Sequence, residues 1–276
     1  MAAAAAAFRP GRRQNVTEPL LKVESLSFAY PGEGALFHDL SFSVGKGKTF
    51  TILGPNGAGK TSLLNCLTGL VPPSAGRVTV GGRDILKLSA SERAKRVGYV
   101  PQLHQGTYGY SVRDFVVMGR APHIAFLKSP SPEDYAIADG VLERMGLSAF
   151  ARRPYTQLSG GERQQVLIAR VIVQNPDLIV MDEPTNHLDY GNQIKALKMI
   201  RSLTAEGYSV LFTTHTPDHA LLIGGEVGIL NAQGEMLTGP AERIVCEEGL
   251  SSLYGVRLYM DYVKKVDRVA CVAPSI

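Results

Sequence analysis

The apolar positions of this chain follow two patterns. Near the beginning, apolar and polar residues alternate over 21–23 and again over 40–44, and the segment 31–34 between them consists mainly of glycine and proline. Alternation with a period of two is typical of half-buried strands, and glycine with proline is typical of a turn. We therefore expect a hairpin layer of strands here, and valines 78 and 80 and the run 97–100 predict further strands.

Continuous apolar runs replace this alternation further along the chain. The runs 50–53, 178–181 and 210–213 are short and almost entirely apolar or β-branched, which predicts strands buried on both faces of a parallel sheet. Helices are expected over 61–70 and 162–174. Strands that alternate with helices predict an α/β fold with a mostly parallel sheet.

Signals for helix starts gather in the middle of the sequence. Serines 89, 111 and 131 are each followed three residues later by a carboxylate, which is the spacing of a capping box. The last of these helices has Pro132 at its first position and ends at Gly146. We therefore expect a helical subdomain at about 103–160.

The ends of the chain differ from this central part. Residues 1–18 begin with an alanine run followed by basic residues, the reverse of a secretory signal, and are expected to form a disordered tail. The main domain spans 19–240 and closes with a hairpin of 227–230 and 235–237 around a turn. Residues 241–276 are expected to form a helical extension with a solvated charged face.

A glycine-rich stretch lies between the predicted strand 50–53 and the predicted helix 61–70. Its glycines let backbone amides converge on phosphate oxygens at a helix N-terminus, as in a phosphate loop (P-loop). Lys60 would neutralise the terminal phosphates, and the hydroxyl of Thr61 would bind Mg²⁺. The expected nucleotide-binding residues are Gly54, Pro55, Asn56, Gly57, Ala58, Gly59, Lys60, Thr61 and Ser62.

Two adjacent carboxylates follow the apolar run 178–181. Parallel strands end at the sheet edge where ligands bind, so Asp182 and Glu183 are expected beside the phosphate loop. Asp182 would hold Mg²⁺ through water, and Glu183 would orient or deprotonate the water that attacks the terminal phosphate. An acid pair after a strand is also a common helix cap, and the nearby phosphate loop favours the functional interpretation.

Residues 158–164 read Leu-Ser-Gly-Gly-Glu-Arg-Gln. Two glycines bare the backbone, Ser159 offers a hydroxyl, and the helix that begins near Glu162 points its positive end outward, as a second phosphate-binding device would. A capping box explains Ser159 and Glu162 but not Gly160 and Gly161 between them. The segment resembles the signature of ATP-binding cassette (ABC) proteins. A kinase or another phosphate-loop enzyme gives no reason for it.

The resemblance covers nearly the whole chain and implies a P-loop nucleotide-hydrolase core, an antiparallel β subdomain and an α-helical signature subdomain. Tyr30 matches the aromatic residue that stacks on adenine, and Gln102 matches the glutamine that links Mg²⁺, water and the membrane subunit. Asp189 matches the dimer-contact loop, and His215 matches the switch histidine. Each of these matches alone is a weak signal. A packed tyrosine, a solvated loop glutamine and a histidine with a structural hydrogen bond at a strand end are all common in proteins. The resemblance implies Lys60, Gln102, Glu183 and His215 as catalytic residues, Thr61, Gln102 and Asp182 as the Mg²⁺ site, and Ser159, Gly160, Gly161, Glu162 and Asp189 as further nucleotide-site residues.

The resemblance also implies partners. Two such subunits stack head to tail, so that ATP on Lys60 of one is covered by Ser159 and Gly161 of the other. Hydrolysis of ATP, with Mg²⁺ as the metal, then opens this homodimer and moves two permease subunits in the membrane. The chain would lie peripherally on the cytoplasmic face of the cell membrane, and a periplasmic or extracellular substrate-binding protein would act on it indirectly.

Between Gln102 and the signature, the stretches 108–114, 117–123 and 129–134 resemble the corresponding region in the ATPases of metal-chelate importers. These importers carry ferric siderophores, haem or cobalamin, and related systems carry molybdate or tungstate. The alternative is a non-transport ABC ATPase that acts on the ribosome or on DNA. The pair Asn186-His187 stands where many transporters have Ser-Ala, and it occurs in both classes.

Composition narrows these alternatives. The net charge is only +4, from 29 basic and 25 acidic residues, and the sequence has no long basic block of the kind that binds nucleic acid. We therefore expect no nucleic-acid partner. The three cysteines are far apart and suggest neither a disulfide framework nor a zinc site. No apolar run reaches the roughly 18 residues that cross a bilayer.

Overall fold

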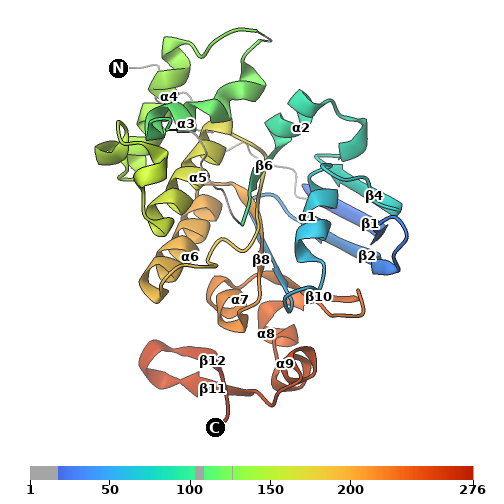
Figure 1. Ribbon diagram of the computed structural model, residues 1–276. Helices are drawn as coiled ribbons and strands as arrows, with labels where there is room; N and C mark the ends of the chain where they lie inside the picture. The colour runs from blue at the N-terminus through green and yellow to red at the C-terminus, as the bar shows by residue number, and fades with distance from the viewer. Residues whose placement is uncertain (1–17, 103–108, 126, 276) are drawn as a thin grey trace.

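The computed structural model of the chain describes residues 18–102, 109–125 and 127–275. A six-stranded sheet with the order β10-β9-β3-β8-β7-β6 forms its centre (Figure 1). Neighbouring strands are parallel except β10, which runs antiparallel to β9. The strands are β3 (Thr49–Leu53), β6 (Val97–Val100), β7 (Leu178–Met181), β8 (Ser209–Thr214), β9 (Glu226–Leu230) and β10 (Met236–Pro240).

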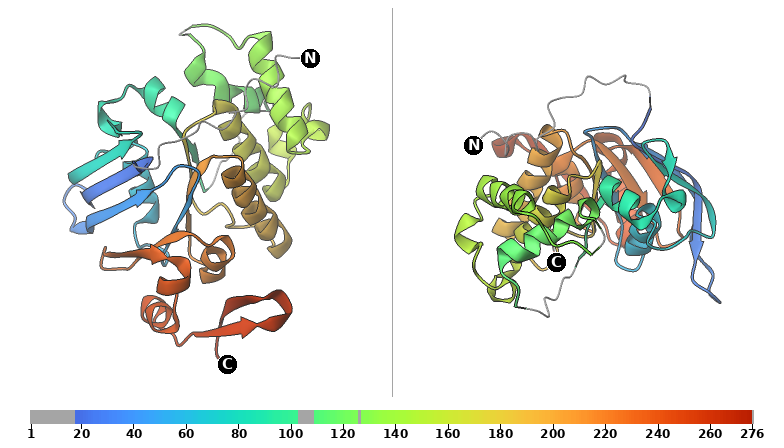
Figure 2. Two further views of the ribbon diagram at one scale, coloured as in Figure 1. Left: turned by 180° about the vertical axis from the view of Figure 1, so that it is seen from behind. Right: turned by 90° about the horizontal axis from the view of Figure 1, so that it is seen from above.

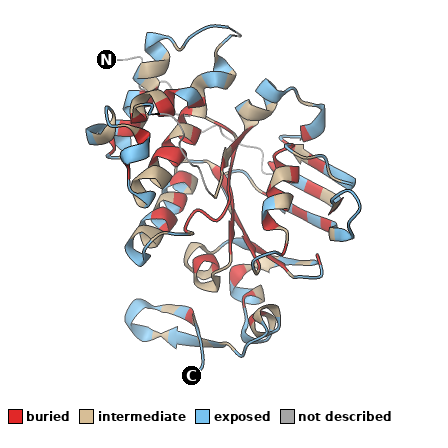
Figure 3. Ribbon diagram, viewed as in Figure 1, coloured by how far each residue is buried: buried red, intermediate tan, exposed pale blue. Residues whose placement is uncertain are grey.

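The central strands are buried on both faces, as their apolar runs predict (Figure 3). In β7, Leu178 and Val180 join one apolar cluster, whereas Ile179 and Met181 join another on the opposite face. This alternation follows from the two-residue period of a strand. The sheet is therefore held between two packed layers, and its carboxyl edge is fixed from both sides.

The layer on the first face consists of an antiparallel sheet and one helix. The strands β1 (Leu21–Ala29), β2 (Ala35–Val44), β4 (Ala75–Val80) and β5 (Arg83–Asp84) form the order β2-β1-β4-β5. Helix α1 (Lys60–Leu67) packs its leucines into the same cluster as both sheets. The short helices η2 (Ile85–Lys87) and α2 (Ala90–Arg96) follow. The predicted antiparallel layer is thus confirmed.

The opposite face carries the helical layer (Figure 2). Ser89 and Ser131 form complete capping boxes, and Ser111 accepts a hydrogen bond from the backbone of Asp114, so the three predicted helix starts are present. The elements are α3 (Val112–Val117), η3 (Met118–His123), α4 (Pro132–Arg144), η4 (Ser148–Phe150), η5 (Tyr155–Gln157), α5 (Gly160–Gln174) and α6 (Tyr190–Ala205).

The C-terminal segment differs from the predicted helical extension. Helices α7 (Pro217–Ile223), α8 (Ala241–Ile244) and α9 (Glu247–Tyr254) are present, but the chain then forms an antiparallel hairpin of β11 (Tyr259–Val263) and β12 (Arg268–Val272), joined through η6 (Lys264–Val266). Three of the five residues of β11 are tyrosine or valine and two of the five of β12 are valine, and such side chains favour the pleated surface of a strand over a helix. The helical prediction for this part is therefore wrong.

Two expectations concern the membrane and the N-terminus. Within the described ranges, no helix is both long and apolar enough to cross a bilayer. The predicted tail, 1–18, lies outside the described residues except for Glu18.

Candidate active site

The phosphate loop connects the buried strand β3 to helix α1. Gly57 and Gly59 have φ angles of 84° and 90°, in the left-handed region that favours glycine. Gly54 is required for a different reason, because a Cβ there would lie 2.5 Å from the carbonyl oxygen of Leu230. Glycines 54, 57 and 59 are therefore required for the conformation of the loop. The loop leads directly into the N-terminus of α1, where the helix dipole favours phosphate.

Lys60 begins α1, and its side chain turns back under the loop. Its ammonium donates to the carbonyl oxygens of Gly54 and Pro55, both at 2.9 Å, and lies 3.0 Å from Oε1 of Glu183. The side chains of Lys60 and Glu183 are only 5% and 7% exposed. The predicted phosphate-binding lysine and the predicted carboxylate thus meet in a buried ion pair.

Glu183 has an unusual backbone conformation. Its φ of 43° places a non-glycine residue in the left-handed region, which costs about 1–3 kcal/mol. Its N–H donates to Oγ1 of Thr213 at 2.8 Å, which holds the strained residue against β8. Backbone strain of this kind is often found at functional sites, so the conformation of Glu183 agrees with the role predicted from the sequence motif.

Three polar side chains converge on Oε2 of Glu183. The amide nitrogens of Gln102 and Asn186 donate to this oxygen at 3.3 and 3.0 Å, and Nδ1 of His215 lies 3.3 Å away. The carboxylate is thus held from β6, β8 and its own loop. Lys60, Gln102, Glu183 and His215, which were predicted as catalytic from distant parts of the sequence, lie together.

Asp182 directly follows β7, next to Glu183, and its side chain contacts the first turn of α1. Its Oδ2 accepts a hydrogen bond from the Thr61 hydroxyl at 2.7 Å, and its Oδ1 accepts one from Thr213 at 2.8 Å. The Tyr99 hydroxyl lies 3.5 Å from Oδ2, and burial, together with the Asp182 charge, raises the pKa of this phenol.

The pair of Thr61 and Asp182 fits Mg²⁺. This cation is usually bound by one or two protein oxygens and completes its octahedron with substrate phosphates and water. A threonine hydroxyl and a carboxylate in contact supply such oxygens. Gln102, the third predicted metal residue, contacts Glu183 instead of either one. Among the described residues, no group of three or more His, Cys, Asp and Glu forms a self-sufficient metal site.

Tyr30 directly follows strand β1 of the antiparallel sheet and lies beside α1. Its hydroxyl is 2.9 Å from the Ser62 hydroxyl, and its ring meets Phe28 edge-on at 4.9 Å between centroids. The ring is 43% exposed. A partly exposed aromatic side chain that is fixed beside the phosphate loop is suited to stacking on a nucleotide base.

The signature lies at the N-terminus of α5. Ser159 Oγ accepts from Glu162 N, and the Glu162 carboxylate accepts from Ser159 N at 2.7 Å, so the capping box weighed from the sequence is present. Hydrogen bonds from the backbone and the hydroxyl of Ser159 to the carboxylate lower the pKa of Glu162. Within the described part of the chain, no hydrogen bond or ion pair joins 159–162 to the phosphate loop.

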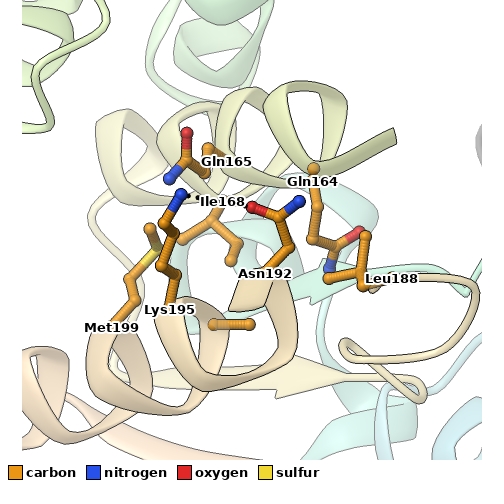
Figure 4. A pocket seen from close by; sticks show the side chains of 9 residues that line it. Gln164, Gln165, Ile168, Leu188, Asn192, Lys195 and Met199 are labelled. Atoms are coloured by element: carbon orange, nitrogen blue, oxygen red, sulfur yellow. Dashed lines mark hydrogen bonds between the residues drawn. The ribbon is translucent and has the colours of Figure 1, made fainter. Parts of the chain in front are cut away.

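A tight seam joins the signature to α6 (Figure 4). A Cβ on Gly161 would lie 2.9 Å from Cγ of Asn192, whereas a Cβ on Gly160 would meet nothing within 4 Å. Asp189 caps α6, because its side chain accepts a hydrogen bond from Asn192 N at 2.8 Å. The cavity left in the seam is about 10 Å³, enough for a single water at most. The predicted dimer-contact residue and the signature are therefore mechanically connected.

The sequence interpretation missed three members of this site. Thr213 bridges the backbone of Glu183 and the side chain of Asp182, Asn186 donates to Glu183, and Tyr99 reaches Asp182. Thr213 could have been found, because the apolar run 210–212 of the central strand β8 is followed by Thr213 and Thr214 at its carboxyl end. Tyr99 gave no signal, since an aromatic residue is ordinary in a strand.

Comparison with known proteins agrees with this geometry. The family model for ABC transporters matches residues 37–186. The molybdate import ATP-binding protein MolC of Haemophilus influenzae is 36% identical over 87% of this chain and 89% of its own. The iron(3+)-hydroxamate import ATP-binding protein FhuC of Bacillus subtilis is 36% identical over 72% of this chain and 74% of its own.

A solved structure extends the likeness to nearly the full length. It belongs to a transporter assigned to the metal-chelate type of ABC transporters, in an inward-facing conformation. The TM-score is 0.83 at 34% identity, with 94% of this chain and 98% of that chain covered. The chain therefore belongs to the ABC transporter family, as a nucleotide-binding ATPase.

Proposed function

We propose that this chain is the ATP-hydrolysing subunit of an ABC importer and that Glu183 acts on the attacking water. The observation that carries the proposal is the convergence on one carboxylate: Lys60 pairs with one oxygen, while Gln102 and His215 approach the other. A buried carboxylate oriented from several sides can accept a proton in a defined direction.

The chemistry follows from these contacts. Lys60 binds the terminal phosphate of ATP, exchanging its contact with Glu183 for phosphate oxygens. Glu183 then accepts a proton from water as the water oxygen bonds to the γ-phosphorus and the bond to the ADP oxygen breaks. Thr61 and Asp182 hold Mg²⁺, which neutralises phosphate charge when bound. Gln102 and His215 keep the carboxylate oriented.

The exposed signature supports a dimer. Ser159 and Gly160 are exposed at the N-terminus of a fifteen-residue helix, where backbone amides attract phosphate. We infer that Ser159, Gly160 and Gly161 cover the ATP bound by a second copy, with Asp189 at the contact between the two. ATP then joins the subunits, and its hydrolysis releases them.

The relatives indicate a membrane partner and the kind of cargo. Their names describe import of molybdate and of iron(3+)-hydroxamate, and the similar structure is a transporter assigned to the metal-chelate type. We infer that two copies of this chain move two permease subunits from the cytoplasmic face of the membrane. The cargo class is a metal chelate or an oxyanion such as molybdate, delivered to the permeases by an external binding protein.

The substitution Glu183→Gln tests the catalytic half of this proposal. It preserves the shape of the side chain and removes the proton acceptor, so turnover should fall by about 100-fold or more. ATP should then accumulate a dimer, detected by light scattering after size-exclusion chromatography. Adding Gly160→Arg to this variant provides the control, because the new side chain points into open space within its own chain but would block a second copy.

Two results would overturn the proposal. An E183Q chain that stays monomeric with ATP, with and without its permease, removes the dimer mechanism. A chain that co-purifies with ribosomes or DNA instead of a permease removes transport. Uptake into vesicles that contain the chain, its permease and its binding protein, with labelled ferric hydroxamate and molybdate compared, identifies the cargo class.

A further inference from the structure

The C-terminal segment 241–276 carries no motif, yet it contacts the loop of the switch histidine. The Tyr254 hydroxyl, at the end of α9, donates a hydrogen bond of 2.6 Å to the main-chain carbonyl of His215. We propose that Tyr254 is a positioning residue for His215, so that the C-terminal segment sets how this histidine meets Glu183. The proposal rests on the function proposed above.

Tyr254 is built into its place. Its ring is partly buried against an apolar cluster in which α9, α7 and β9 meet, with Leu250, Ala220 and Val227 among its members. Burial raises the pKa of the Tyr254 phenol, and Cys271 and Glu183 add to the shift. The hydroxyl therefore keeps its proton at neutral pH and can donate it.

The histidine loop is tied on its inner side by the core. Oγ1 of Thr214 accepts from the N–H of Thr216 at 3.1 Å, and Nδ1 of His219 lies 3.1 Å from the same oxygen and 3.2 Å from Oγ1 of Thr185. The His215 ring is 41% exposed, with Nδ1 3.3 Å from Glu183. Tyr254 supplies a tie from the other side, through the carbonyl of the same residue.

The hairpin fastens this arrangement to α7, the helix that follows the histidine loop (Figure 1). Arg268 of β12 pairs with Asp218 of α7 at 2.9 Å, and Cys271 N donates to the same carboxylate oxygen at 3.4 Å. Met260 N of β11 donates to Glu247 of α9 at 2.8 Å. Hairpin, α9 and α7 thus form one connected unit around residue 215.

The effect of such a tie is on orientation. Without the hydroxyl of Tyr254, the carbonyl of His215 loses its hydrogen bond and the peptide plane can rotate. The imidazole contacts Glu183 through a single long contact of 3.3 Å, so its orientation is then no longer fixed. Because nucleotide binding uses Lys60 and the loop, the affinity for ATP should not change.

The substitution Tyr254→Phe tests the proposal in the full-length chain. Loss of one hydrogen bond should lower kcat for ATP hydrolysis about three- to tenfold, with KM for ATP unchanged. Tyr262→Phe is the matched control, because the Tyr262 hydroxyl is exposed and donates to Asp267 within the hairpin itself. Y262F should leave kcat unchanged.

A spectroscopic readout separates positioning from general structural damage. The Cε1–H proton resonance of His215, identified by its disappearance in H215A, should shift in Y254F and not in Y262F. The resonance of His123, which contacts the end of α5 at 2.9 Å from the Gln174 carbonyl, should stay in place in both. In the H215A background, Y254F should cause no further loss of turnover.

The outcomes distinguish this proposal from the one on which it rests. An unmoved His215 resonance in Y254F, or a loss of kcat in H215A as large as in the wild-type background, overturns the positioning role. Full turnover in H215A instead overturns the catalytic assignment of His215, and the resonance still decides whether Tyr254 positions its backbone.

Discussion

The phosphate-loop end and the signature end of this molecule are built differently, although both present a helix N-terminus. At the first, Lys60, Asp182 and Glu183 are 6%, 2% and 7% exposed, and each has partners from distant elements. At the second, Ser159 and Gly160 are exposed, and the capping box pairs the N–H groups of Ser159 and Glu162 with side chains from the same four residues.

The difference indicates where each half finds its ligand. The buried half is organised in advance by long-range contacts, as a site that performs chemistry requires. The exposed half is fixed by short-range hydrogen bonds at the start of its helix and by the seam with Asn192, and the N–H groups of Gly160 and Gly161 lie at the exposed end of the helix. A chain that holds its reactive groups inside and its second phosphate-binding surface outside is suited to completing its site with another copy.

The largest expected effect concerns the buried half. Replacing Lys60 by Met strands the Glu183 carboxylate in a buried position, and breaking a buried pair from one side costs about 3 kcal/mol. The double variant K60M/E183Q should recover much of this stability, because no unpaired charge remains. Urea unfolding of the three chains measures the free energy of unfolding.

An exposed ion pair provides the control for this prediction. Lys22 and Glu24 are 53% and 46% exposed, and Lys22→Met should change stability by less than about 0.5 kcal/mol. If K60M is no more destabilising than K22M, the buried pair does not hold the site together, and the contrast between the two ends loses its energetic basis.

A second prediction uses pH to test the core behind the histidine loop. Burial, with the nearby His215, lowers the pKa of His219 from 6.5 to about 4, and Asp218 partly opposes this. Between these values the unfolded chain binds the extra proton, so stability is complete above pH 6.5 and falls as the pH drops towards 4. At pH 5 the loss is about 2 kcal/mol.

The variant His219→Gln removes the imidazole that binds this proton in the unfolded chain. The free energy of unfolding should then depend less on pH between 7 and 5. His123→Gln, at an exposed position, should leave the wild-type slope unchanged. A slope that survives in H219Q contradicts the buried neutral histidine, and with it the rigid inner tie of the histidine loop.

The parts of the site that sequence alone predicted are those in which local chemistry fixes the residue type. A loop that wraps phosphate needs glycine at 57 and 59 because of their positive φ, and a carboxylate pair after a central strand lies at the ligand-binding edge of a parallel sheet. Local sequence patterns also predicted other parts of the fold. The period of the apolar residues indicated the strands of both sheets, and the capping residues Ser89 and Ser131 indicated the starts of two helices.

What could not be predicted depends on contacts between distant residues. Tyr99 and Thr213 are ordinary strand residues until the sheet places them beside Asp182. The hairpin 259–272 lies in the segment for which the sequence predicts a helical extension, whereas its tyrosines and valines pair across two short strands. A two-stranded hairpin gains its stability from the surface it packs on, here α7, which sequence patterns do not reveal.

The smallest expected effect tests whether Ser159 of the signature only caps its helix or also binds phosphate. Ser159 and Ser131 form the same capping box, with Glu162 and Asp134 as the third residues. Replacing either serine by Ala should cost about 1 kcal/mol of stability, measured by urea unfolding, because the same cap is lost in each case. If Ser159 is only a cap, the two variants should also retain the same ATPase activity.

We expect the activities to differ. Ser131 starts α4, away from the phosphate-binding groups, so S131A should hydrolyse ATP at the wild-type rate once folded. S159A should lose about tenfold, because a hydroxyl that binds phosphate in the closed dimer contributes a charge-assisted hydrogen bond there. Equal turnover in the two variants would reduce Ser159 to its capping role and leave only the exposed amides of Gly160 and Gly161 to bind the second copy's nucleotide.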